Sequence, residues 1–254
     1  MNEFYLRNVV MRNSTKKIPK KMRVAVFFAG RITAYEHSSA ALENLCKTYN
    51  CTLFCSLNKS ASNPYLNGFF NKYNIEPSQI NFEKTVYPEW LFKLKNHPWS
   101  KHDNVYSSIY HNKRAFDLIE DYVKLHKVKF DAVVFFRSDI HSSQPLILLK
   151  PAKNTVYIPE GFNGGHPPGF LEKLKMTTQE YGVNGTLAYG SYNSMKIFCS
   201  IVDRLHEICI KNSVDFHHER LIKRGLELAG IKIHLFKYKY ILHPKRHNSH
   251  YNLS

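Results

Sequence analysis

The stretch that decides the fold is Phe-Asp-Ala-Val-Val-Phe-Phe-Arg-Ser-Asp-Ile, residues 130–140. Its core, 132–136, is an unbroken apolar run rich in β-branched and aromatic side chains, which is typical of a strand buried on both faces of a parallel sheet. The run ends abruptly in Arg137, Ser138 and Asp139. Because ligands of open α/β sheets bind beyond the carboxyl ends of the strands, this polar triplet is a candidate ligand-binding element. A solvated turn with a local ion pair is the alternative.

Working outward, a second apolar strand is predicted at 23–29, and it ends at Gly30 and Arg31. A glycine directly after a parallel strand allows a tight turn and a close approach of a ligand to the backbone. A helix that ends near Tyr49 and a strand at 51–57 follow. This strand–helix–strand order indicates the beginning of a doubly wound α/β sheet.

The rest of the chain continues the same alternation. The clearest helix is predicted at 107–127, where Glu120 is expected to pair with Lys124 four residues later. Further strands or turns are predicted at 81–87, 156–158, 181–189 and 231–242, and further helices begin at 63 or run over 191–208 and 217–229. We therefore expect a single Rossmann-like α/β domain at 22–254, with a mostly parallel central sheet flanked by helices, after a basic arm at 1–21.

The composition is that of a folded and strongly basic protein of 254 residues. A hydrophobic fraction of 43% argues against disorder, and no apolar run is long enough to span a membrane. The formal net charge of +16 attracts polyanions, which include nucleic acid, an anionic membrane surface and nucleotide diphosphates. A basic nucleic-acid-binding protein without catalytic activity is therefore one hypothesis. It ranks second, because the chain has no aromatic-basic RNA motif, zinc finger or P-loop.

The cysteines and the N-terminal residues bear on the compartment. The five cysteines are an odd number without the spacing of metal ligands, which suits a reducing environment. Cys51 and Cys55 fall on one face of their predicted strand, where buried thiols are expected. Residues 1–22 contain no apolar stretch of a secretory signal. We therefore expect a cytoplasmic protein.

Two loops hold further candidate residues. A loop rich in glycine and proline is predicted at 159–170, and it suits a lid or an acceptor site with Glu160 and His166 as its polar side chains. Trp90 and Trp99 lie in a second long loop. A sugar could stack on such a tryptophan, and a packing role is equally compatible with the sequence.

Several pieces of the chain, taken in order, resemble GT-A-like glycosyltransferases of large DNA viruses, algae and bacteria. They are Arg-Val-Ala-Val-Phe-Phe-Ala-Gly-Arg at 23–31, the strand that ends in Arg-Ser-Asp, the segment 184–195, and the helix with His218-Glu219 and Leu221. The resemblance spans about 23–242. It implies transfer of a sugar from a nucleotide sugar to a hydroxyl of a glycan or glycoprotein, often with Mn²⁺ or Mg²⁺, in the host cytoplasm if the protein is viral.

The resemblance also assigns roles to residues. Arg137-Ser138-Asp139 would be a variant of the family's Asp-x-Asp motif, with Asp139 as a ligand of the metal or the diphosphate. Arg137 stands in place of the first aspartate, so strict metal dependence is open. Gly30, Arg31 and Arg137 would contact the nucleotide or its diphosphate, and His243 could add a metal ligand. The pair Asn184-Gly185 departs from the family, where Asn-Asp is common.

Sugar transfer makes two chemical demands. The leaving diphosphate accumulates negative charge, which a hard cation or arginine and lysine can stabilise. An inverting transfer also needs a carboxylate to deprotonate the acceptor hydroxyl, and Glu219 and Glu160 are the candidates. Glu219 could equally be a first-turn carboxylate that stabilises the start of its helix, and Glu160 an exposed loop charge.

Overall fold

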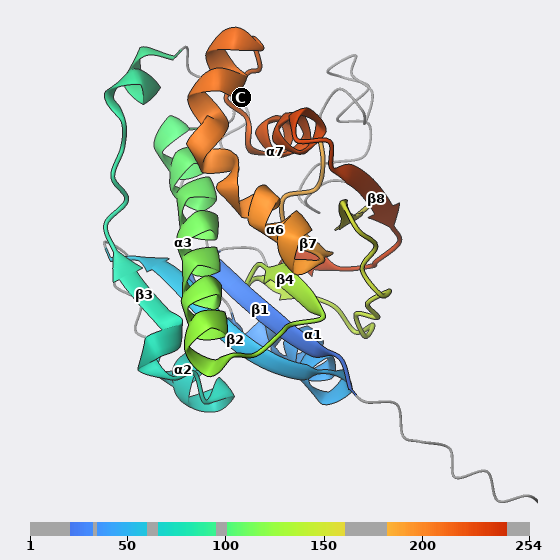
Figure 1. Ribbon diagram of the computed structural model, residues 1–254. Helices are drawn as coiled ribbons and strands as arrows, with labels where there is room; N and C mark the ends of the chain where they lie inside the picture. The colour runs from blue at the N-terminus through green and yellow to red at the C-terminus, as the bar shows by residue number, and fades with distance from the viewer. Residues whose placement is uncertain (1–20, 33–34, 60–65, 95–100, 161–181, 243–254) are drawn as a thin grey trace, which may run out of the picture.

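Seven strands form one open sheet in the computed structural model, which describes residues 21–32, 35–59, 66–94, 101–160 and 182–242 (Figure 1). Six strands run parallel, and β7 is antiparallel to both of its neighbours, so the predicted mostly parallel α/β sheet is confirmed. In spatial order the strands are β3 (Ile80–Glu83), β2 (Asn50–Asn58), β1 (Arg23–Gly30), β4 (Ala132–Phe136), β7 (Leu187–Gly190), β6 (Thr155–Pro159) and β8 (Lys232–Phe236).

The central strands β1 and β4 are buried on both faces, which is why both read as continuous apolar runs. All five residues of β4 are at most 2% exposed. Alternate side chains enter different cores: Phe27 and Phe135 lie on one side, with ring centroids 5.4 Å apart, and Phe28 and Phe136 lie on the other, 6.0 Å apart. Both faces of the sheet must therefore be covered by other elements.

Helices supply that cover on each side (Figure 1). One face packs against α3 (His102–His126), α6 (Tyr192–Cys199) and α7 (His218–Leu228). The other face packs against α1 (Tyr35–Thr48), α2 (Leu66–Tyr73) and a small antiparallel sheet of β5 (Ile140–His141) and β9 (Ile241–Leu242). Short helical turns complete the fold at Pro77–Gln79, Glu89–Lys93, Ser200–Arg204 and Glu207–Lys211. None of the helices in these ranges has the length and apolar character needed to cross a membrane.

Several predicted elements have different bounds in the structure: the strand predicted at 81–87 ends at Glu83, and the one predicted at 181–189 begins at Leu187. Helix α3 begins at His102, about one turn before the prediction, because Val105 and Tyr106 extend its buried face. The α-helix predicted at 191–208 ends at Cys199. A 3₁₀ helix at Ser200–Arg204 and a π-helical segment at Glu207–Lys211 follow it. The single strand predicted at 231–242 is wrong: β8 ends at Phe236, and the chain then leaves the main sheet to form β9 beside β5.

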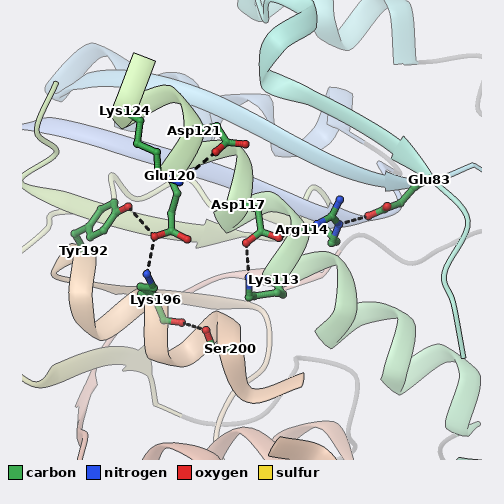
Figure 2. A network of polar contacts seen from close by, with 10 residues as sticks. All are labelled: Glu83, Lys113, Arg114, Asp117, Glu120, Asp121, Lys124, Tyr192, Lys196 and Ser200. Atoms are coloured by element: carbon green, nitrogen blue, oxygen red, sulfur yellow. Dashed lines mark hydrogen bonds and ion pairs between the residues drawn. The ribbon is translucent and has the colours of Figure 1, made fainter. Parts of the chain in front are cut away.

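The outward face of α3 carries a network of ion pairs (Figure 2). Glu120 accepts a hydrogen bond of 2.7 Å from Lys196 of α6, and Lys124 pairs with Asp121 at 3.5 Å, so the predicted Glu120–Lys124 pair is wrong. Packing of α3 against α6 brings Lys196 within reach of Glu120, which spacing along one helix could not indicate. Exposed pairs of this kind contribute at most about 1 kcal/mol each.

All five cysteines are free thiols. Cys55 is fully buried and Cys51 is half-buried, and both belong to the core on the α1 side of the sheet. The prediction that they share one face of β2 is confirmed. Burial raises the pKa of the Cys55 thiol well above its ordinary value, so this sulfur stays protonated.

A buried histidine joins α3 to the carboxyl ends of β2 and β3. His111 is 0% exposed; its Nδ1 lies 2.9 Å from Ser56 Oγ and its Nε2 lies 3.2 Å from Thr85 Oγ1. Burial lowers the pKa of His111 to about 4, so the folded protein keeps the ring neutral over most of the acidic range. The unfolded chain, with an ordinary pKa of 6.5, takes up a proton much earlier.

We predict that His111 makes the protein sensitive to acid. Since the unfolded state binds the proton below pH 6.5 and the folded state only near pH 4, stability falls as the pH drops through this window, by about 3 kcal/mol from this group. Urea unfolding between pH 6.5 and 4.5 should show a shallower pH slope for His111→Gln, although the variant is less stable at pH 7. His126→Gln, at an exposed position of the same helix, should keep the wild-type slope. A wild-type slope in His111→Gln would contradict the prediction.

Candidate functional site

The carboxyl ends of β1 and β4 lie side by side where the direction of winding reverses. From β1 the chain builds β2 and β3 on one side, and it then returns to place β4 on the other side of β1. Ligands of open α/β sheets bind at such a switch point. Arg31 follows β1 and Ser138 follows β4, and Ser138 Oγ donates a 3.3 Å hydrogen bond to the Arg31 carbonyl oxygen. The two segments singled out in the sequence are therefore neighbours.

Arg137 and Asp139 form a two-pronged ion pair. Arg137 Nε lies 2.9 Å from Asp139 Oδ1, and Nη2 lies 2.6 Å from Oδ2. The aspartate side chain is 4% exposed and the arginine side chain 29%. The carboxylate thus lies inside the protein and the guanidinium at its surface, where N–H groups that this pair does not use can still donate. The local ion pair considered for this triplet is present.

The segment before β7 holds the backbone of this pair. Arg137 N donates to the Thr186 carbonyl oxygen at 3.0 Å, and Thr186 N donates to Asn184 Oδ1 at 2.9 Å. Tyr240 joins from the far end of the chain: its hydroxyl accepts a hydrogen bond from Asn184 Nδ2 and lies 2.7 Å from Thr186 Oγ1. Burial raises the pKa of Tyr240, so its hydroxyl remains neutral beside Arg137 and Asp139.

Sequence reasoning missed Tyr240, because it treated 231–242 as one strand. No periodicity in Lys-Tyr-Lys-Tyr at 237–240 indicates that the chain passes here from β8 of the main sheet to β9 of the small sheet. Only the pairing of β9 with β5 shows that this segment returns to the Arg137–Asp139 region. In that pairing Leu242 lies opposite Ile140, the residue after Asp139.

The first turn of α7 packs on the other side of this segment. Val183 N donates to the Glu219 carbonyl oxygen at 3.3 Å. A Cβ atom at Gly185 would collide with the His218 ring, so that ring fills the space where residue 185 would otherwise have a side chain. His218 Nε2 lies 3.4 Å from Ser108 Oγ of α3. Burial, together with the charge of Arg137, lowers the pKa of His218 to about 3, and the ring is neutral at physiological pH.

Glu219 is a second buried acid in this region, besides Asp139. It is 8% exposed, and its Oε2 lies 3.1 Å from Nδ1 of His217, the residue that precedes α7. Its Oε1 lies 3.7 Å from the position of a Cβ atom on Gly185, so the carboxylate is beside the segment that holds Arg137. Its position in the first turn also suits the helix dipole, so both roles expected for Glu219 remain compatible with the structure.

The second candidate acid, Glu160, is exposed at the same edge of the sheet. It follows β6, and its backbone N donates to the Phe236 carbonyl oxygen at 2.8 Å. Since β6 is two strands from β4, Glu160 starts roughly 10 Å from the Arg137 segment. Trp90 has a packing role, with its ring centroid 5.3 Å from that of His206.

Other candidates lie outside the described residues: Trp99, His166 and the expected metal ligand His243, together with most of the loop predicted at 159–170 and the basic arm.

The arrangement around Asp139 does not fit a divalent cation. Mn²⁺ and Mg²⁺ take oxygen ligands, and Arg137 occupies both carboxylate oxygens of Asp139. Across the described ranges, histidine, cysteine, aspartate and glutamate form no group of three that could hold a metal ion. A cation on Asp139 would have to displace a charge-assisted pair that is largely shielded from water.

We predict that Gly185→Ala destabilises the protein through His218. The added methyl group would overlap the imidazole ring, which must move, and overpacking of this kind costs about 1–3 kcal/mol. In a His218→Ala background the overlap is absent, so the same substitution at residue 185 should cost much less. Urea unfolding of the four proteins measures this difference, and equal costs in the two backgrounds would show that the ring is elsewhere.

Neither the models of known protein families nor the sequences of curated proteins match this chain. The resemblance to GT-A-like glycosyltransferases therefore remains a prediction from the quoted motifs.

Proposed function

We propose that this protein is a glycosyltransferase that moves a sugar from a nucleotide sugar to a hydroxyl of a glycan or glycoprotein. The observation that supports this most is the fixed guanidinium of Arg137 at the switch point, next to the Gly30–Arg31 turn. This is the position where an open α/β sheet binds a ligand, and arginine is suited to phosphate recognition.

The donor would bind with its diphosphate between the ends of β1 and β4. The Arg137 side chain is 29% exposed and has N–H groups that Asp139 does not use, and Arg31 is exposed next to Gly30. Gly30 has a φ of +87°, a conformation that favours glycine, and among the described residues beyond its chain neighbours no atom lies within 4 Å of where its Cβ would be. The backbone of this turn is therefore open to a close approach by the nucleotide.

Glu219 would act as the base. As the acceptor oxygen bonds to the anomeric carbon of the donor, its proton passes to the Glu219 carboxylate, and the electron pair of the broken bond leaves with the diphosphate. His217 Nδ1 lies 3.1 Å from Oε2 of this carboxylate. Glu160 is the second candidate for this role, because it is exposed at the same edge of the sheet.

A ligand screen tests the donor class. Nucleoside diphosphates should raise the unfolding temperature, since a ligand that binds only the folded state stabilises it. A generic oligonucleotide should produce no comparable shift at physiological salt. Stabilisation by the oligonucleotide alone, with an affinity that falls steeply as salt rises, would instead favour the nucleic-acid-binding hypothesis.

We predict that Asp139→Ala abolishes sugar transfer and leaves the fold intact. The substitution removes both hydrogen bonds that orient Arg137, so the donor diphosphate loses its fixed partner. Release of nucleoside diphosphate from a panel of UDP- and GDP-sugars measures the effect, and circular dichroism checks the fold. The matched control is Asp131→Ala at the amino end of β4, where Asp131 accepts a 2.8 Å hydrogen bond from Arg23 N; it should remain active. Full activity of Asp139→Ala would refute the role of the pair.

We predict that Glu219→Gln lowers kcat about 100- to 10,000-fold, because the amide cannot accept the acceptor proton. Binding of the nucleotide should be unchanged, since Glu219 has no part in holding the diphosphate. Glu227→Gln, at an exposed position of the same helix, is the control and should keep the wild-type kcat. A wild-type kcat for Glu219→Gln would transfer the role of base to another group, with Glu160→Gln as the next variant.

A further inference from the structure

The Arg137–Asp139 pair has a geometry that distinguishes an anion-binding group from a metal site. Both oxygens of Asp139 face Arg137 at 2.6 and 2.9 Å, and the carboxylate has almost no contact with solvent. A carboxylate in this position acts on the guanidinium and leaves little room to bind a cation. The Arg137 side chain, in contrast, is 29% exposed, and its guanidinium has N–H groups that Asp139 does not use.

The surroundings of the pair limit how Arg137 can move. Its backbone N is held by the Thr186 carbonyl oxygen, and its side chain is held by Asp139. Tyr240 and His218, the titratable groups whose pKa values respond to its charge, are both neutral at physiological pH. No second acid with a described hydrogen bond to Arg137 competes for its outer edge. A phosphate would therefore meet an arginine that is already oriented, which reduces the entropy lost on binding.

Arg31 supplies a positive charge at the switch point, because the Arg137–Asp139 pair is neutral overall. Asp139 offsets much of the charge of Arg137, whereas Arg31 is exposed. Ser138 Oγ ties the Arg31 backbone to the segment that follows β4. Two guanidinium groups, one from each side of the switch point, can thus approach the same diphosphate.

We propose that the Arg137–Asp139 pair takes the place of a divalent cation, so that this protein binds nucleoside diphosphates and transfers sugar without a metal ion. The inference rests on the proposed glycosyltransferase function. Arg137 and Arg31 contact the diphosphate, and Asp139 is a positioning residue that acts through Arg137. When the bond between the sugar and the diphosphate breaks, its electron pair remains on the diphosphate, where the two guanidinium groups offset the added charge.

Isothermal titration of the full chain with UDP and GDP tests the inference directly. Each titration is run once in EDTA and once in Mn²⁺. We expect dissociation constants that agree within about twofold between the two buffers, because no ligand of the diphosphate is a metal. Binding that occurs only with Mn²⁺ would overturn the inference and leave the proposed function standing. Absence of binding in both buffers would overturn the proposed function, and the inference with it.

Two variants test the roles within the pair. Arg137→Lys keeps the charge but loses the two-pronged geometry, and Asp139→Asn keeps the shape but loses the charge that orients Arg137. Each should weaken UDP binding in EDTA by about tenfold or more. The matched control is Arg114→Lys, because Arg114 also forms ion pairs, with Glu83 at 2.6 Å and Asp117 at 2.9 Å, but lies on α3; it should bind UDP as the wild type does.

A variant that carries both Arg137→Lys and Asp139→Asn tests whether Asp139 affects UDP binding by positioning Arg137. If Asp139 acts through Arg137, Asp139→Asn should weaken UDP binding little further once Arg137 is lysine. Additive losses would mean that Asp139 acts independently of Arg137 and would overturn its positioning role. Thermal unfolding of each variant confirms that the titrated protein is folded, and Asp139→Asn alone still tests the role if Arg137→Lys does not fold.

Discussion

Burial of β4 on both faces is the constraint on which the rest of the structure depends. Its five side chains enter two different cores, so no polar group can be placed along the strand without losing its water. The first polar side chains that follow can lie only at the carboxyl edge. The same holds for β1, and their adjacency brings the ends of both strands together. The candidate site thus follows from where the core ends.

At that edge, the ion pair between Arg137 and Asp139 compensates the carboxylate of Asp139 for its loss of water. A carboxylate with 4% exposure needs a partner, and an arginine two residues away provides both hydrogen bonds. The pair makes Asp139 unsuited to holding a cation in this arrangement, and it leaves other N–H groups of Arg137 unused in a side chain that is 29% exposed. One local interaction therefore determines whether the motif suits a metal or an anion.

Sequence reasoning was most successful where burial imposes a simple pattern. The strand at 132–136 and the helix that ends before Gly230, which has a φ of +67°, were predicted and are confirmed, and Gly30 at the end of β1 has a φ of +87°. It failed where distant elements meet. Glu120 pairs with Lys196 on another helix, and the chain after Phe236 leaves the sheet. Neither event has a periodic signal, because each depends on which surfaces pack together.

By itself, the sequence determined that the chain forms an α/β sheet, that its central strands are buried on both faces, and that a polar triplet stands at the end of β4. Spacing and polarity carry that information, since they report the local choice between core and solvent. Only the tertiary structure decided that Asp139 is bound to Arg137, that His218 fills the space over Gly185, and that Tyr240 returns to the edge of the sheet. The contacts of His218 and Tyr240 join residues from separate elements, and their geometry exists only once the two cores have packed; the Arg137–Asp139 pair is local, and packing decides only that its carboxylate is buried.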